Sequence, residues 1–421
     1  MTTHVFEVRG RCQREPWRLS GLDRMVESWA DYLLVYPYCI EGGVFAEHLA
    51  KALDLNPYFA GRKMTLDQGM VVSGGNEGAR LEQVRVSGML PDGVLMGRYD
   101  QFDPFCDRTR REQHRRSKTS LKQPLLQIRL SVFDDATVIG FSVWHGLSDG
   151  TTFFEFLERL AECCQGRDTP VRLPVFEPFQ AAPGAVPEGA LVDRWQYPDA
   201  VQQSPVFAEG AFTLHEADID RLLEGCVCPG FMRQDYLIGY LWRLIVMTDT
   251  LEAGERTALY PVYDARQLMD MSPAQVGNLL CYPTVALRAG QVREAGLAEL
   301  ASHIRDAATA RVLDSDTLQE ELQAICAQVE SGGQGRYLLQ PLYESLYGHS
   351  VLFNNLTGMP WQRFDLGQGA PVHVDAPMHD PLRFVQFFPC LSRPGALTVK
   401  VNLPESHLHR FRDRFNQELQ S

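Results

Sequence analysis

The residues best suited to chemistry lie in one hexapeptide, HGLSDG, from His145 to Gly150. A histidine at the end of a strand can project into a cleft with little conformational freedom, as a general base must in order to reach a substrate hydroxyl. The chain has 11 histidines, and an H-x-x-x-D-G pattern is expected by chance only about 0.05 times in a chain of this composition. A structural histidine in a turn is the alternative, and the hexapeptide alone leaves both interpretations open.

The elements around the hexapeptide should place it between a strand and a helix. Alternating apolar residues predict strands at 123–133 and 137–144, with a hairpin turn at Asp134 and Asp135. The apolar spacing of TTFFEFLERLAECC predicts an amphipathic helix over 151–164. We therefore expect His145 at a strand terminus, and Gly150 in the tight turn that follows.

Helical and strand patterns alternate along the whole chain, which favours an α/β fold. The 421 residues are enough for two domains of roughly 200 residues each. Proline and glycine become frequent after Gly166, which is typical of a connection between domains. We predict an N-terminal domain over 1–168, a crossover over 169–210 and a C-terminal domain over 211–421. Further helices are predicted at 44–53, 233–247 and 297–312, and further strands at 259–263, 280–287 and 396–403.

The composition argues against several classes of protein. The formal net charge is −13, so the overall field would repel nucleic acid and anionic membranes. The N-terminal MTTHVFEVRG lacks the basic and apolar regions of a signal peptide, and no run of 18 apolar residues occurs. The ten cysteines lack C-x-x-C spacing, so we expect buried thiols instead of a zinc site. These features predict a cytoplasmic protein without nucleic-acid or membrane partners.

Segments along nearly the whole chain follow the pattern of one enzyme family. They are LSGLDRMV (19–26), LAKALDLNPYFAGR (49–62), the stretch 122–150 that ends in HGLSDG, RQDYLIGYLWRLI (233–245), VYDARQLM (262–269), VGNLLCYP (276–283) and VNLPESHLHRF (401–411). The segment FDLGQG (364–369), followed by Pro371, stands where this family has D-F-G-W-G. Together they resemble the BAHD family of acyl-CoA-dependent acyltransferases, whose other hallmark is H-x-x-x-D-G. Leu366 and Gln368 replace the family's Phe and Trp, so we expect altered packing of this loop.

This resemblance implies both a fold and a reaction. The fold would be two similar mixed-sheet α/β domains, of the chloramphenicol acetyltransferase type, with a channel at their interface. The reaction would move an acyl group from acyl-CoA to a hydroxyl or amine of a small-molecule acceptor in secondary metabolism. His145 would be the general base, without a covalent intermediate, and acyl-CoA would be a co-substrate, with no bound cofactor or metal. A monomer is implied as well.

The resemblance also assigns roles to individual residues. Asp149 is expected to point away from the substrate and to pair with Arg266, so that it holds the catalytic turn. Asp365, Gly367 and Gly369 are expected to form a structural loop.

Other candidates follow from their positions on predicted strands. Asn354, Asn355 and Thr357 come at the end of the strand pattern at 350–353 and could stabilise an oxyanion. Tyr36 and Tyr38, on the first strand, could line the acceptor channel, although aromatic strand residues also commonly pack in a core.

Three alternatives compete with this hypothesis. The residues GLSDG match the G-x-S-x-G nucleophile elbow of α/β-hydrolases, with Ser148 as nucleophile and Asp375 and His379 as partners, but no H-G-G-G segment precedes them. His373, Asp375, His379 and Asp380 could instead bind a metal ion. A carrier-dependent condensation domain would share the H-x-x-x-D-G turn, but such domains generally carry two adjacent histidines, whereas this chain has Trp144 before His145.

Overall fold

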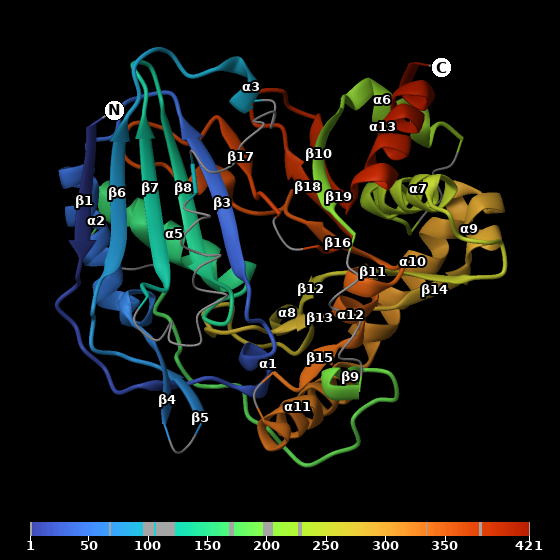
Figure 1. Ribbon diagram of the computed structural model, residues 1–421, viewed down its shortest axis with the longest axis horizontal. Helices are drawn as coiled ribbons and strands as arrows, with labels where there is room; N and C mark the ends of the chain where they lie inside the picture. The colour runs from blue at the N-terminus through green and yellow to red at the C-terminus, as the bar shows by residue number, and fades with distance from the viewer. Residues whose placement is uncertain are drawn as a thin grey trace.

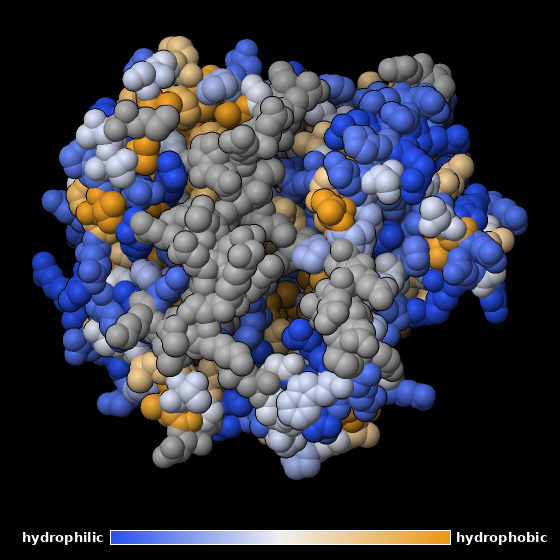
Figure 2. Space-filling view, viewed as in Figure 1, coloured by the Kyte–Doolittle hydropathy of each residue, from blue (hydrophilic) through white to orange (hydrophobic). Residues whose placement is uncertain are grey.

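Two six-stranded sheets, one in each half of the molecule, form the framework of the chain (Figure 1). A computed structural model describes residues 2–66, 69–95, 105–106, 123–167, 172–196, 205–225, 230–333, 335–378 and 381–420. Between the two halves the surface is hollowed, and apolar side chains lie at the bottom of the hollow (Figure 2). None of the helices in the described ranges combines the length and hydrophobicity needed to cross a membrane.

The first sheet contains the strand that leads to His145. Its order is β1 (Thr2–Val8), β6 (Ala79–Arg85), β7 (Leu126–Val132), β8 (Thr137–Trp144), β3 (Trp29–Tyr36) and β17 (His373–Asp375). Only β6 and β7 run parallel. Helices α2 (Gly42–Leu55) and α5 (Gly150–Cys164) pack on one face, where Phe153 of α5 stacks on Tyr32 with ring centroids 4.9 Å apart. All of β8 is buried, so its terminus is held rigidly.

The second sheet has mixed strand directions as well. Its order is β10 (Phe207–Leu214), β19 (Leu397–Pro404), β18 (Phe384–Pro389), β16 (Val351–Asn355), β11 (Arg256–Pro261) and β14 (Val285–Arg288). Strands β11, β16 and β18 are parallel, and the other pairs are antiparallel. Helices α7 (Arg233–Thr248), α10 (Leu297–Leu313) and α13 (Glu405–Gln420) share one core with this sheet. The predicted α/β fold with two similar mixed sheets is confirmed.

Shorter elements connect these layers. The short strands are β2 (Trp17–Arg18), β4 (Lys63–Leu66), β5 (Gly69–Val72), β9 (Leu191–Asp193), β12 (Tyr263–Asp264), β13 (Leu280–Cys281) and β15 (Tyr337–Leu339). The remaining helices are α1 (Gly21–Arg24), η1 (Pro57–Ala60), α3 (Asp92–Leu95), η3 (Arg194–Gln196), α6 (Glu216–Leu223), α8 (Ala265–Leu268), α9 (Ala289–Glu294), α11 (Ser315–Gly332), α12 (Gln340–Tyr347) and η5 (Trp361–Arg363). The predicted strand at 280–287 is therefore two strands, β13 and β14.

The second half of the chain also contributes to the first sheet. Strand β17 pairs with β3, so that Asp375 lies opposite Leu33. Leu356, Trp361 and Phe364 belong to the same hydrophobic core as α5. The sequence prediction did not include this exchange, which joins the two halves through a shared sheet as well as through an interface.

A buried ion cluster ties this exchanged strand to the second sheet. Lys400 Nζ on β19 lies 3.1 Å from Asp375 Oδ2 on β17 and 2.6 Å from Glu209 Oε1 on β10. All three side chains are at most 5% exposed. Removing one charge from such a cluster would leave the others uncompensated, so it fixes how the two sheets meet.

Candidate active site

His145 lies where strand β8 ends and helix α5 is about to begin. Its backbone N–H donates to Ser28 O over 2.9 Å, and its carbonyl accepts from the Ser148 N–H over 3.1 Å. Asp149 caps α5, because its Oδ1 accepts from the Thr152 N–H over 2.9 Å. The structure therefore has the strand, turn and helix that the sequence predicted, with a partly exposed His145 side chain at the turn.

Gly146 is required by the tryptophan that precedes the histidine. A Cβ at position 146 would overlap the indole ring of Trp144. That ring is only 2% exposed, and Lys63 Nζ lies 5.2 Å from its centroid. Trp144 thus folds back under the turn, and only a glycine leaves room for it.

The ring of His145 is oriented by Asn278, a residue that the sequence analysis did not single out. His145 Nδ1 lies 3.0 Å from Asn278 Oδ1. The Asn278 amide is oriented by its other end, where Nδ2 donates to His145 O over 2.8 Å and to Asp23 Oδ1 over 3.2 Å. An amide oxygen can only accept, so Nδ1 must carry the ring proton of neutral His145. Nε2 then holds the lone pair, and it makes no hydrogen bond within the described part of the chain.

Asp149 and Arg266 form a fully buried ion pair. Arg266 Nη1 lies 2.7 Å from Asp149 Oδ2, and both side chains are 0% exposed. The same nitrogen lies 3.0 Å from Asp264 Oδ1. Burial alone would lower the pKa of Arg266, but the carboxylates of Asp149 and Asp264 outweigh it, so the pKa is raised. The contact that the resemblance implied is present in the structure.

This ion pair also holds the segment that carries Asn278. Arg266 Nε donates to Gln275 O and Nη2 to Gly277 O, each over 2.8 Å, and Asp149 Oδ2 accepts from the Leu279 N–H over 3.0 Å. Gly277 has a φ of +125°, a conformation that glycine adopts without steric cost. The pair therefore reaches His145 indirectly, because the segment that it fixes supplies the residue that orients the ring.

The FDLGQG segment forms a loop around one carboxylate oxygen. Asp365 Oδ1 accepts from the Gly367 N–H over 2.7 Å and from the Gly369 N–H over 2.8 Å. Both glycines have positive φ, +98° and +125°. Gln165, at the end of α5, donates to Asp365 O over 2.6 Å. The loop is therefore fastened to the helix that follows the His145 turn.

Tyr36 and Tyr38 fasten this loop to β3. Tyr36 is 0% exposed and donates its hydroxyl to Phe364 O over 2.8 Å. Tyr38 donates to Gly369 O over 3.0 Å. These bonds favour a packing role for both tyrosines over the expected position along an acceptor channel.

Comparison with known proteins identifies the family. The chain matches the Transferase family over residues 15–217 and 229–418. It belongs to this family, that of the BAHD acyltransferases. The predicted membership is confirmed, and with it the enzyme class, an acyltransferase.

Individual BAHD relatives and solved structures match this chain over most of its length. It is 22% identical to rosmarinate synthase of Plectranthus scutellarioides, in an alignment that covers 94% of each chain. It is 24% identical to a hydroxycinnamoyl-CoA:5-hydroxyanthranilate N-hydroxycinnamoyltransferase of Avena sativa, in an alignment that covers 89% of this chain and 87% of the relative. The crystal structure of F. sporotrichioides TRI101, complexed with coenzyme A and T-2, superposes with a TM-score of 0.74 at 15% identity and covers 95% of this chain and 97% of TRI101. This structural likeness shows the shared fold.

The three oxyanion candidates of this BAHD chain have different surroundings. Asn355 Oδ1 accepts from the Thr357 N–H over 3.0 Å and from its hydroxyl over 2.6 Å, and Asn355 Nδ2 donates to Gln234 Oε1. Asn355 and Thr357 therefore satisfy each other. Asn354 is half-buried on β16, opposite Gln386 of β18, and its side chain makes no hydrogen bond within the described ranges.

The competing hypotheses find little support in the site. Ser148 is 1% exposed, and its hydroxyl has no hydrogen-bond partner among the described residues, so no base is placed to activate it. Asp375, its expected acidic partner, lies against Lys400. His379 and Asp380 lie outside the described residues, and in the described part no three His, Cys, Asp or Glu side chains gather as a metal site requires.

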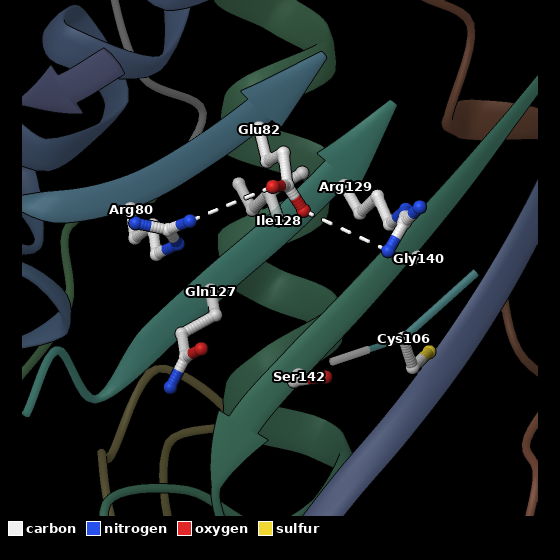
Figure 3. Close-up of a pocket in the computed structure, with 8 residues that line it drawn as sticks. All are labelled: Arg80, Glu82, Cys106, Gln127, Ile128, Arg129, Gly140 and Ser142. Carbon is white, nitrogen blue, oxygen red and sulfur yellow. Dashed lines mark ion pairs between the residues drawn. The ribbon is translucent and has the colours of Figure 1, made fainter. Parts of the chain in front are cut away.

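A small pocket lies elsewhere, on the face of the first sheet opposite α5 (Figure 3). Figure 3 shows Glu82 between two arginines. Its Oε1 lies 3.5 Å from Arg80 Nη2, and its Oε2 lies 3.7 Å from Arg129 Nη1. The other lining residues are Cys106, Gln127, Ile128, Gly140 and Ser142. The pocket contains none of the residues around His145, so it is not part of the candidate active site.

Proposed function

We propose that this chain transfers an acyl group from acyl-CoA to a hydroxyl or amine of a small-molecule acceptor, with His145 as general base. The observation that carries the proposal is the 3.0 Å contact of His145 Nδ1 with Asn278 Oδ1, which leaves Nε2 as the basic nitrogen. The hydroxycinnamoyl-CoA in the name of the Avena sativa relative and the coenzyme A bound to TRI101 support the donor. The net charge of −13 supports a small acceptor over a nucleic acid.

The reaction proceeds without a bond to the enzyme. As the acceptor oxygen or nitrogen attacks the thioester carbon, His145 Nε2 takes its proton, and the carbonyl electrons move onto the carbonyl oxygen. The tetrahedral oxyanion then collapses, the carbon–sulfur bond breaks, and the CoA thiolate takes the proton from His145. Holding both substrates in the correct geometry contributes about 7 to 11 kcal/mol against the barrier.

Other residues support this chemistry without taking part in proton transfer. Asp149 and Arg266 hold the turn and the segment of Asn278, and the loop of Asp365 holds the end of α5. Asn354 is the candidate for a hydrogen bond to the oxyanion, because Asn355 and Thr357 satisfy each other. By resemblance to the family, the enzyme works as a monomer in the cytoplasm.

A panel of acyl-CoAs, each tested against alcohols and amines, tests the proposal. CoA release would be followed with a thiol reagent and the acylated product by mass spectrometry. His145→Ala should lower kcat by about 10² to 10⁴, which corresponds to roughly 3 to 5 kcal/mol of barrier, with the melting temperature unchanged. A His145→Ala variant with a near-normal rate would refute the proposal.

The same assay separates the alternatives. If the chain is a transferase, fluorophosphonates should not label the wild-type protein, and Ser148→Ala should leave kcat nearly unchanged. If it is a hydrolase, the wild-type protein should be labelled, and Ser148→Ala should lose both turnover and labelling. A condensation domain would accept a carrier-bound acyl group in preference to the free acyl-CoA.

A further inference from the structure

Behind Asn278 lies a buried carboxylate that the proposed mechanism does not use. Asp23 is 1% exposed and occupies the third position of helix α1, where it forms a capping box with Ser20. Its Oδ2 accepts from Ser20 N over 2.9 Å and lies 2.6 Å from Ser20 Oγ. Its Oδ1 accepts from Asn278 N over 2.7 Å and from Asn278 Nδ2 over 3.2 Å. One side chain thus joins the N-terminal helix to the residue that orients His145.

The bonding leaves no ambiguity in the orientation of the Asn278 amide. Asp23 Oδ1 faces two N–H groups, so it is an acceptor whether or not the carboxyl carries a proton on its other oxygen. If the amide were flipped, its oxygen would face Asp23 Oδ1 and His145 O, and two hydrogen bonds would become contacts between acceptors. Asp23 therefore keeps Asn278 Oδ1 turned toward His145 Nδ1.

The surroundings of Asp23 hold it rigidly in this position. Gly21 packs so closely on α11 that a Cβ there would overlap the backbone of Cys326, and the Gly21 N–H donates to Cys326 Sγ over 3.1 Å. On the other side, a Cβ added to Gly277 would lie 3.1 Å from Asp23 Oδ1. Helix α1 and the segment of Asn278 thus approach the carboxylate from opposite sides, and neither can move without breaking a buried hydrogen bond.

We propose that Asp23, supported by Ser20, is a positioning residue for catalysis: through Asn278 it fixes the ring orientation and the tautomer in which His145 Nε2 is the base. This inference rests on the proposed function, because it requires His145 to be the base. Asp23 does not touch the reacting atoms. It acts on the fraction of enzyme molecules in which His145 is correctly placed, and so on kcat more than on substrate binding.

Asp23→Ala and Asp23→Asn test this role together. Asp23→Ala removes the acceptor of Asn278 N and one of the two acceptors of Asn278 Nδ2, so that only His145 O still holds the amide. We expect kcat to fall about 10- to 100-fold, as misplacement of a catalytic group by about 1 Å does, with KM within about twofold. In Asp23→Asn the amide oxygen can stay on Asn278 while its NH₂ group donates to Ser20 Oγ. The Ser20 N–H then loses its acceptor, which lowers stability, but the contacts to Asn278 remain, so most of the rate should return. In spectra of enzyme labelled with ¹⁵N in its histidine rings, the His145 signals should show the Nδ1–H tautomer in wild type and Asp23→Asn, and a mixture in Asp23→Ala.

Asp235→Ala is the matched control. Asp235 is 0% exposed, caps α7 at the same helix position, and accepts from Met232 N over 2.8 Å and from Arg305 Nε over 2.9 Å. Its removal should lower stability while kcat stays near wild type. If Asp235→Ala and Asp23→Ala lowered kcat equally, the effect would be general destabilisation and the positioning role would be overturned.

A double variant separates this inference from the proposed function. If Asp23 acts through His145, then Asp23→Ala combined with His145→Ala should be no slower than His145→Ala alone. An active His145→Ala enzyme would refute the proposed function itself. A dead His145→Ala enzyme beside an Asp23→Ala enzyme with normal kcat would overturn only the role of Asp23. Should Asp23→Ala fail to fold, Ser20→Ala, which removes one contact to the carboxylate, gives the same test with a smaller expected loss.

Discussion

Separate and joint removal of Asp149 and Arg266 should reveal a strong coupling between them. Both are 0% exposed, and breaking a buried pair typically costs about 3 to 5 kcal/mol because one charge is left uncompensated. The loss caused by Asp149→Ala should lie at the low end of this range, because Arg266 Nη1 still has Asp264 Oδ1 as a partner, 3.0 Å away. Arg266→Ala should fall at the high end, since it leaves two carboxylates without their cation and removes the donors to Gln275 O and Gly277 O.

The double variant decides whether the two residues act as a unit. Independent losses would sum to about 6 to 10 kcal/mol, close to the whole stability of a typical domain. For a shared pair we expect the double variant to lie near the larger single loss, with a coupling energy of about 2 to 3 kcal/mol. Strictly additive losses would refute the assignment of the pair.

Urea unfolding, followed by tryptophan fluorescence and by circular dichroism, measures these free energies where the two probes coincide. The partly exposed pair of Arg336 and Asp193, with Nε 2.9 Å from Oδ2 and side chains 34% and 13% exposed, is the control. Its variants should lose much less stability than those of the buried pair, because solvent screens an exposed ion pair. Each single variant of the buried pair should also lose activity, because the segment that carries Asn278 depends on it.

Three further predictions concern the turn, the loop and a remote histidine. Gly146→Ala should destabilise the protein by about 1 to 3 kcal/mol and lower kcat, because the methyl group would displace Trp144 under the turn; thermal unfolding and a shifted tryptophan emission check this. Tyr36→Phe should lower stability by about 1 to 3 kcal/mol, because Phe364 O loses its buried donor, and a raised acceptor KM would instead place Tyr36 in the channel. Burial lowers the pKa of His407 from 6.5 to about 4, so the unfolded chain takes up its proton first as the pH falls. The stability due to neutral His407 is thus present above about pH 6.5, and about 2 to 4 kcal/mol of it is lost as the pH falls toward 4. Urea unfolding measured at a series of pH values should show this loss in wild type, and His407→Gln should reduce it.

The local part of the site could be predicted because local patterns determine it. The alternation of strand β8, the glycines of the turn and the apolar spacing of α5 all lie within 137–164, and each follows from side-chain geometry over a few residues. The ion pair of Asp149 and Arg266 spans 117 positions. No periodicity predicts such a contact, and it came instead from the resemblance of VYDARQLM to the family pattern.

The rest of the site could not be predicted because it depends on tertiary contacts between short segments. Asn278 lies 133 positions from His145, and Asp23 lies 255 positions from Asn278. Strand β17 has three residues, too few for an alternation to be recognised. Two signals were present in the sequence but not used: Ser20 and Asp23 have the spacing of a capping box, and the leucines and other apolar residues of α11 follow a helical period.

The contacts that support the His145 turn are spread over the whole chain. The first half supplies His145 and Asp149, but the second half supplies Asn278, which fixes the tautomer, and Arg266, which fixes the segment of Asn278. The second half also supplies β17 to the first sheet and the Asp365 loop to the end of α5. A histidine placed by β8 alone would keep its position but lose the hydrogen bond to Asn278 that sets the tautomer the proposed mechanism requires. In the proposed mechanism the basic form of His145 is therefore a property of the assembled interface, and the contacts that lock the two halves together would serve catalysis as much as stability.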